Sequence, residues 1–119
     1  MLKVEKCLKT KIVQFTQIKL RVVRENEGIV LVEMEEMPHY KMLCGNVNAY
    51  KDYLKVCNAY DKKHTLAMFK DLIRNFDIKK AGAIHCDYIE EDDLYVTRDG
   101  NHRACILYYL GHKEILIKY

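Results

Sequence analysis

The sequence is poor in residues that interrupt a chain: it has one proline and five glycines in 119 residues. No stretch rich in proline, glycine or serine divides it, and it contains no internal repeat and no low-complexity tract. Its length is the usual size of one domain, which is roughly 100–200 residues. We therefore expect a single domain over residues 1–119, and we exclude collagenous and repeat architectures.

Long hydrophobic runs are also missing, whereas a membrane-spanning helix needs roughly 18 or more consecutive apolar residues. Residues 1–10 hold three lysines and no apolar run, so we expect no signal peptide. The five cysteines are an odd number, are widely spaced and include no Cys-x-x-Cys pair. Reduced thiols explain this pattern better than a disulfide framework. We therefore predict a cytoplasmic protein that makes no membrane contact.

The composition that remains is that of a folded protein, because half of the residues are hydrophobic and 31% are charged. The formal net charge is only +3, from 20 Lys and Arg against 17 Asp and Glu. The charges are unevenly placed, since residues 1–24 are mainly basic and residues 87–93 mainly acidic. Solvated surface explains both segments, and a dedicated nucleic-acid binder is usually more basic. Nucleic acid is therefore a less favoured partner.

The first third of the chain has the pattern of strands. Apolar and polar residues alternate over residues 13–22, with a slip near Thr16. The turn sequence Glu25-Asn26-Glu27-Gly28 follows, and then the mostly β-branched run of residues 29–32. We predict an N-terminal hairpin over about residues 11–34, with the strand pattern stopping before Pro38.

Helices and further strands are predicted for the rest. Apolar residues at helical spacing predict two helices within about residues 48–76. A strand–turn–helix unit is expected over about residues 94–111, where Gly111 supplies the helix stop. Short strands are expected before this unit, at residues 83–89, and after it, at residues 115–117. The predicted fold class is α+β, a single domain with a small mixed sheet.

The sequence Asp99-Gly100-Asn101-His102-Arg103 at the predicted start of the last helix is the most informative segment. Asp99 is the expected N-cap, and Gly100 has no Cβ, so that a ligand can approach the backbone. A helix start offers unsatisfied N–H groups and a positive dipole end, which bind anions and phosphate above all. Arg103 can reach the same anion with a planar fork, and His102 can donate or accept near neutral pH. The alternative is an ordinary capped helix with exposed polar side chains.

These residues, with Ala104, the apolar helix, Gly111 and residues 113–115, resemble the signature of the ParB/sulfiredoxin superfamily. The resemblance covers about residues 95–117, roughly a fifth of the chain. Asn101 stands where sulfiredoxins carry their catalytic cysteine. Asn101 and His102 also replace the Glu and first Arg of the ParB partition proteins. Asp99, Gly100 and Arg103 match the Asp-Gly-x-x-Arg pattern of a third branch, which includes free-serine kinases.

The resemblance implies a ParB/sulfiredoxin-like fold with a nucleotide or phosphate bound by Gly100, Asn101, His102 and Arg103. For the third branch it implies ATP or ADP as cofactor and transfer of a phosphoryl group to a small hydroxyl substrate. Such a transfer usually needs a divalent metal such as Mg²⁺, for which Asp99 is a candidate ligand. A chain of this size leaves little material for a substrate pocket, and a homodimer would supply the rest.

A second polar cluster surrounds Pro38. Residues 32–37 alternate between apolar and acidic, so Glu33 and Glu35 are expected on one face of a strand. In the kinase-like relatives an early glutamate is the base that acts on the substrate hydroxyl, and Glu36 or Glu35 is its candidate counterpart. His39 competes for this role because its pKa lies closer to neutrality. The alternative is a charged edge strand followed by a capping turn.

A zinc site is an alternative, because His85-Cys86 and His102-x-x-Cys105 contain two typical zinc-ligand types. No Cys-x-x-Cys or His-x-x-x-His pair supports such a site. Buried thiols are the ordinary explanation, and we predict no metal site of this kind.

Three functional hypotheses follow. The first is a nucleotide-binding protein, which as an enzyme would be a nucleotide-dependent phosphotransferase or a nucleotide hydrolase. Its candidate catalytic residues are Asp99, Glu36 and His39. The second is a binding module switched by a nucleotide without turnover, whose partner surface consists of residues 1–24 and the tyrosines of residues 50–60. The third is a nucleic-acid-binding or nuclease-like domain that contacts phosphates through residues 1–24.

Overall fold

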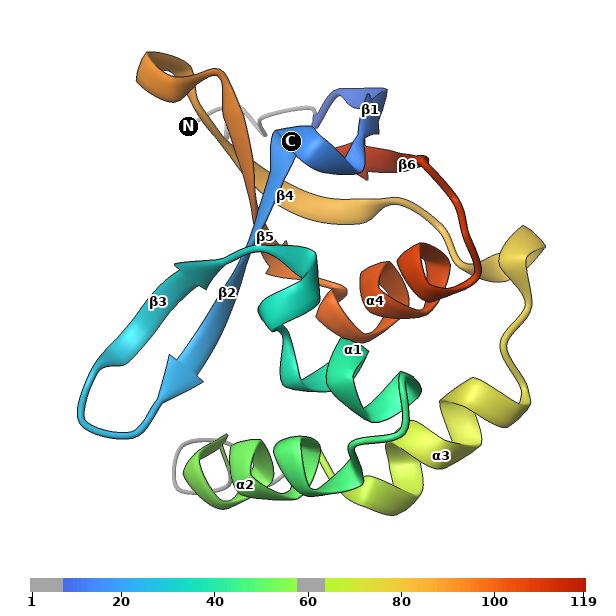
Figure 1. Cartoon of the computed structure of the whole chain (residues 1–119). Coiled ribbons are helices and arrows are strands. Elements are labelled where there is room, and N and C mark those ends of the chain that lie inside the picture. Colours follow the sequence, from blue (N-terminus) through green and yellow to red (C-terminus); the bar gives the residue numbers. More distant parts are fainter. Residues whose placement is uncertain (1–7, 58–63) are drawn as a thin grey trace, which may run out of the picture.

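The computed structural model describes residues 8–57 and 64–119. This part of the chain folds into a six-stranded sheet and four α-helices that gather on one side of the sheet (Figure 1). The strands are β1 (Thr10–Gln14), β2 (Ile18–Arg24), β3 (Gly28–Val32), β4 (Ile84–Ile89), β5 (Leu94–Asp99) and β6 (Glu114–Lys118). The helices are α1 (Pro38–Leu43), α2 (Val47–Cys57), α3 (Leu66–Arg74) and α4 (Asn101–Tyr109).

The sheet is mixed, with the strand order β1-β6-β4-β5-β2-β3. The two outer pairs, β1 with β6 and β2 with β3, are antiparallel, as is the central pair β4 with β5. The pairs β4 with β6 and β2 with β5 are parallel. The α+β class and the mixed sheet are therefore confirmed.

The N-terminal hairpin is shorter than predicted. It consists of β2 and β3 alone, in a register that pairs Arg24 with Gly28. The 3-10 turn Phe15–Gln17 separates β1 from β2, and β1 pairs with β6 at the far edge of the sheet. The slip near Thr16 marks this turn, because the change of spacing lets Val13, Phe15 and Ile18 all reach the core.

The segment after β3 is helical, so the expectation of a strand that carries Glu33 and Glu35 on one face is wrong. Strand β3 ends at Val32, the 3-10 turn Met34–Glu36 follows, and α1 begins at Pro38. Proline is well suited to the first position of a helix, because its fixed φ matches the helix and its missing N–H has no acceptor there. Met34 and Met37 are both buried, and the turn between them points the glutamates outward.

Helix α4 lies between two apolar clusters. The larger cluster joins the sheet to α1 and α4, and includes Ala104, Cys105 and Leu107 of α4. The smaller one joins α4 to α2 and α3 through Ile106, Tyr50, Leu54 and Phe69. Four consecutive residues of α4, 104–107, are buried because apolar groups cover the helix on both sides.

Both ends of α4 depend on glycine. Gly100 is the N-cap, with φ of 97°, and the predicted N-cap Asp99 belongs to β5, where it pairs with His85. The chain must turn sharply after Asp99, and the left-handed backbone conformation that this turn requires favours glycine. Gly111 follows the C-cap with φ of 94°, and the bonds from Gly111 N–H to Tyr108 and from His112 N–H to Leu107 complete a Schellman motif. The predicted glycine stop is confirmed.

Within the described residues, 8–57 and 64–119, every helix is too short or too polar to cross a lipid bilayer.

Candidate functional site

A cavity of about 620 Å³ opens where β5 ends and α4 begins. Residues 98–103 supply one polar part of its lining, and α2, α3 and the residues just before α3 supply aromatic and apolar side chains together with Thr65 and Asp71. Five of the predicted site residues from the motif, Asp99 to Arg103, line it, and so does His39 from α1. The fold therefore brings the motif and one residue of the second polar cluster to the same space.

The start of α4, which borders this cavity, has backbone donors that find no acceptor inside the helix. The first bond of the helix runs from Ala104 N–H to the carbonyl oxygen of Gly100, at 2.9 Å. The N–H groups of Asn101, His102 and Arg103 precede it and have no acceptor within the helix. Gly100 has no side chain with which to cap them. Three donors and the positive end of the helix dipole are thus available to an anion.

Arg103 is held in place beneath the turn. Its Nη1 donates to the carbonyl oxygen of Ala81 at 2.5 Å. A Cβ built on Gly100 would lie 2.8 Å from Nη2 of Arg103 and 2.9 Å from Cδ1 of Ile84, so only glycine fits here without displacing a neighbour. The guanidinium charge is therefore fixed beside the helix start, with one of its N–H groups committed to the backbone.

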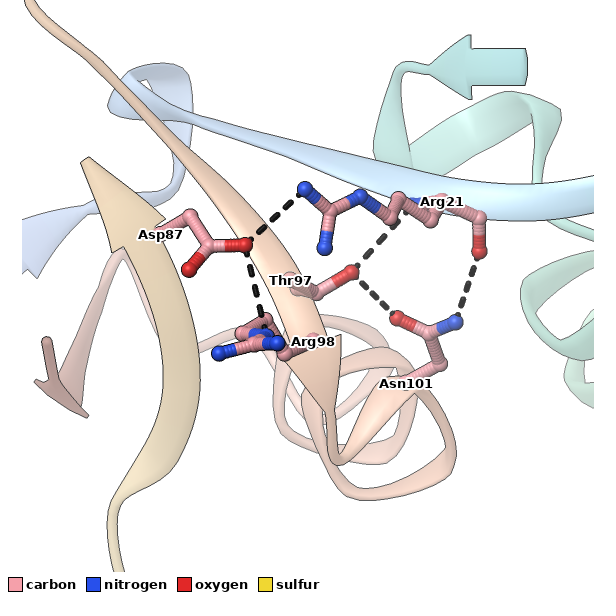
Figure 2. A network of polar contacts seen from close by, with 5 residues as sticks. All are labelled: Arg21, Asp87, Thr97, Arg98 and Asn101. Carbon is pink, nitrogen blue, oxygen red and sulfur yellow. Dashed lines mark hydrogen bonds and ion pairs between the residues drawn. The ribbon is translucent and has the colours of Figure 1, made fainter. Parts of the chain in front are cut away.

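Asn101 uses its side chain for the fold (Figure 2). Its Oδ1 accepts from the Thr97 hydroxyl at 2.6 Å, and its Nδ2 donates to the carbonyl oxygen of Arg21 at 2.8 Å. The Thr97 hydroxyl also accepts from the Arg21 N–H at 3.2 Å. These bonds tie the start of α4 to β2. Only the backbone N–H of Asn101 remains for the ligand-binding role that the sequence predicts for this residue.

A second set of charged side chains lies next to these hydrogen bonds, on the face of the sheet that the helices do not cover. Asp87 Oδ2 lies 2.9 Å from Arg21 Nη2 and 3.4 Å from Arg98 Nε, as Figure 2 shows. The predicted basic surface of residues 1–24 is partly neutralised in the same way, because Lys19 pairs with Glu33 and Arg24 with Glu36. Three of its basic residues thus have acidic neighbours, which weakens the case for a nucleic-acid surface there.

His102 is bonded to a tyrosine from α2. Its Nε2 lies 2.8 Å from the hydroxyl of Tyr50, and its ring stacks on that of His64 with centroids 5.0 Å apart. Burial, followed by the repulsion from His64, lowers the pKa of His102 from 6.5 to about 4. The imidazole is therefore neutral at pH 7, and it contributes hydrogen bonding to the cavity but no positive charge.

His39 lies at the centre of an aromatic cluster and is completely buried. Its ring is surrounded by those of Tyr50, Tyr53, Phe69 and His102. Neither ring nitrogen has a hydrogen-bond partner among the residues that the structure describes. Burial, then His102 and His64, lower the pKa of His39 well below its usual 6.5. A buried imidazole without partners is uncommon, and here it borders the cavity.

Glu36 is not brought to this cavity. Its Oε2 lies 3.5 Å from Nη2 of Arg24, and it borders a different hollow between the hairpin and α2. Glu35 accepts a hydrogen bond from the Tyr108 hydroxyl. The predicted cluster is split because the chain reverses between the 3-10 turn and α1. Of its candidate bases, only His39 borders the cavity.

The thiols considered for zinc are parts of the core. Cys86 and Cys105 are both buried in the larger apolar cluster, and burial raises the pKa of Cys86 to about 11. Across residues 8–57 and 64–119, no three His, Cys, Asp or Glu side chains are grouped so that they could hold a metal ion.

Sequence reasoning missed the residues that α2 and α3 add to the cavity, which include Tyr50, Tyr53, Thr65 and Phe69. The second functional hypothesis predicts a partner surface that includes Tyr50 and Tyr60, but Tyr50 is buried, and Tyr60 lies outside the described residues. The apolar spacing of these helices is what a core-facing helix shows, so it carries no signal of a ligand.

Comparison with protein-family models, curated proteins and solved structures found no match to this chain.

Proposed function

We propose that this protein binds a nucleotide, ATP or ADP, with its phosphates at the start of α4. The observation that carries the proposal is the start of α4 at the edge of the cavity, where the N–H groups of Asn101, His102 and Arg103 have no acceptor within the helix. The fixed Arg103 guanidinium lies beside them. The same residues, 99–103, resemble the Asp-Gly-x-x-Arg branch of the ParB/sulfiredoxin superfamily, and on this resemblance we propose a ParB/sulfiredoxin-like domain.

The two halves of the cavity suit the two halves of a nucleotide. Small-molecule sites usually occupy about 300–1,000 Å³, and this cavity has about 620 Å³. The polar residues 98–103 would hold the phosphates. The aromatic ring of Tyr53 and the exposed side chain of Met68, which also line the cavity, would offer an apolar surface for the base.

The reaction that we propose is transfer of the terminal phosphoryl group to a small hydroxyl substrate in the cytoplasm. The hydroxyl oxygen would form a bond to phosphorus, the bond to the leaving phosphate oxygen would break, and a carboxylate or imidazole would take the hydroxyl proton. Asp99 and His39 are the two candidate catalytic residues that line the cavity. The exposed Asp99 carboxylate also suits a Mg²⁺ ion, which would neutralise phosphate charge.

A charge change at Thr65 gives the sharpest test of anion binding. Thr65 lines the cavity and is the N-cap of α3, accepting from the Met68 N–H at 3.1 Å. Asp and Asn cap a helix equally well, so Thr65→Asp and Thr65→Asn preserve the fold and differ by one negative charge. If phosphates bind nearby, Thr65→Asp should weaken nucleotide binding by about tenfold relative to Thr65→Asn.

The measurement is a thermal-shift titration of both variants and the unmodified chain with ATP, ADP, CTP and GTP, with and without Mg²⁺. A concentration-dependent rise in Tm that is smaller in Thr65→Asp supports the site. If no nucleotide shifts Tm in the unmodified chain, the proposal fails. A phosphate-transfer assay with small hydroxyl acceptors then separates the hypotheses, because binding without turnover indicates a nucleotide-switched module.

A further inference from the structure

Strand β3 forms one outer edge of the sheet, next to β2 (Figure 1). An edge strand has a row of backbone N–H and C=O groups without partners in the sheet, and another strand can pair with them. The side chains at this edge are also apolar and accessible. Ile29 is 68% exposed and Leu31 is 48% exposed. This surface is separate from the cavity, and the inference drawn from it does not rest on nucleotide binding.

The opposite edge of the sheet, β1, has a different sequence. It carries Lys11 within the strand, and Lys9 next to it bonds through its backbone to Tyr119. Lysine on an edge strand is a common protection against pairing with other chains. Strand β3 has the sequence Gly-Ile-Val-Leu-Val, with no charged residue and no proline. The protection that β1 has is therefore missing from β3.

The ends of β3 are strongly acidic. Residues 25–36 contain five glutamates and no lysine or arginine, in a chain whose net charge is +3. Glu27 directly precedes the strand, and Glu33, which directly follows it, is half-exposed and shares its charge with Lys19 of the neighbouring strand β2. An incoming strand that matches this pattern has apolar residues in its centre and basic residues at both ends.

A second copy of this chain does not match the pattern. If two β3 strands paired in antiparallel fashion about Val30, the symmetry would place Glu27 of one copy opposite Glu33 of the other. Parallel pairing in register would place each glutamate opposite itself. Like charges that lie directly opposite each other destabilise a strand pair. Charge therefore disfavours a dimer through β3 and favours a partner with basic flanks.

We propose that the β3 edge binds an extended segment of a partner protein, apolar in its centre and flanked by Lys or Arg, as an added seventh strand. Backbone hydrogen bonds to β3 would supply affinity. The apolar side chains of the segment would lie beside Ile29 and Leu31, and its basic ends beside Glu27 and Glu33.

The test uses a fluorescein-labelled probe peptide, Lys-Lys-Val-Thr-Val-Thr-Val-Lys-Lys, and fluorescence anisotropy with the full chain. Ile29→Lys should weaken binding by at least about tenfold, because it places a charge on the edge. Ile12→Lys is the matched control, since Ile12 is also an exposed isoleucine on an edge strand, at 62% exposure. It should leave binding unchanged.

Three further measurements examine the charge and the backbone bonds. The double variant Glu27→Lys/Glu33→Lys should reverse the preference, so that a probe with Glu in place of every Lys binds better. A probe N-methylated at its three central residues keeps its charge but loses backbone donors, and it should not bind. Amide exchange of residues 28–32 should slow when the unmodified probe is added.

The proposal is overturned if the lysine-flanked probe does not bind, if it binds Ile29→Lys and Ile12→Lys equally, or if the N-methylated probe binds as well. Light scattering provides a further check on the occupant. A dimer that Ile29→Lys converts to a monomer would assign the edge to a second copy of this chain and would also overturn the proposal. Circular dichroism of each variant shows whether its fold is intact.

Discussion

The imidazole rings of His39 and His102 meet edge to face, with their centroids 4.2 Å apart. They come from α1 and from the start of α4, and both line the cavity. His102 is bonded to Tyr50, whereas the buried His39 has no hydrogen-bond partner among the described residues. The pKa of His39 is lowered well below its usual value, and that of His102 to about 4, with burial as the main cause in each case. The pair therefore links protonation to stability.

We predict that the protein loses stability as the pH falls from about 6.5 towards 4. In the unfolded chain both histidines take up protons near pH 6.5, but in the folded protein they stay neutral down to lower pH. The unfolded state binds more protons in this window, so the free energy of unfolding falls with pH, by up to about 1.4 kcal/mol per pH unit for each proton. Urea unfolding at pH 7.5, 6.0 and 5.0 measures the effect.

His39→Phe is the matching variant, because a phenyl ring keeps the aromatic contacts with Tyr50, Tyr53 and Phe69 and does not titrate. It should make the decline with pH shallower, and it should not lower stability at pH 7.5, since it removes two unpaired polar atoms. An unfolding free energy that falls equally steeply in the variant would mean that His39 is not held neutral by the fold.

Much of the fold can be predicted from local sequence. The helix stop at Gly111 and the α+β class are examples, because a glycine stop and the spacing of apolar residues can each be recognised within a few consecutive residues. The pairing of β1 with β6 cannot be predicted in this way, since it joins segments about 100 residues apart. The sequence pattern predicts only that Pro38 stops a strand, but proline is equally suited to the first position of a helix, and α1 begins there.

The next prediction concerns Thr97, whose hydroxyl joins β2 to α4. Thr97→Val keeps the shape but leaves Asn101 Oδ1 without its donor and the Arg21 N–H without its side-chain acceptor. Thr97 is buried, so we expect the free energy of unfolding to fall by about 1–3 kcal/mol. Thr16→Val is the control, because Thr16 is exposed, and it should have little effect. Equal effects in urea unfolding would show that the network does not stabilise the fold.

Gly100→Ala tests the close packing under the turn. The new Cβ would meet Arg103 Nη2 and Ile84 Cδ1, and moving the guanidinium would break its bond to Ala81. Gly111→Ala is the control, since Gly111 also has a positive φ, of 94°, but nothing lies within 4 Å of a Cβ there. Both variants carry backbone strain, and Gly100→Ala should be about 1 kcal/mol less stable than Gly111→Ala by urea unfolding.

A double variant separates the clash from the strain. If the Arg103 side chain is the obstacle, Gly100→Ala combined with Arg103→Ala should be less destabilised than the sum of the single variants. Strict additivity would mean that the clash with Arg103 is not what excludes a side chain at position 100.

The candidate site was only partly accessible to sequence reasoning. Residues 99–103 are contiguous, and a glycine turn before an apolar helix is a local pattern that predicts their common position. Asn101 looked like a ligand-binding residue, but its side-chain bonds depend on Arg21, which the sequence does not place beside it. Phe69 looked like an ordinary core residue because its helical spacing is the same whether the buried face meets a core or a cavity.

The final prediction is that the cysteines differ in reactivity according to their place in the fold. Cys44 is exposed, whereas Cys57, Cys86 and Cys105 are buried. Burial raises the pKa of Cys105, and it raises that of Cys86 to about 11, so neither supplies reactive thiolate at pH 8. Iodoacetamide labelling followed by peptide mass spectrometry should therefore modify Cys44 before Cys57, Cys86 and Cys105.

The buried cysteines, which should react slowly with iodoacetamide, also report on how the core opens. Cys86 lies on β4 and Cys105 on α4, and both belong to the cluster that joins sheet and helix. They should be labelled at one common rate, which increases with urea, because both become accessible when α4 leaves the sheet. Labelling of Cys105 as fast as that of Cys44 without urea would show that α4 is not packed on the sheet. In that case the N–H groups at its start would not be held in the geometry that an anion requires.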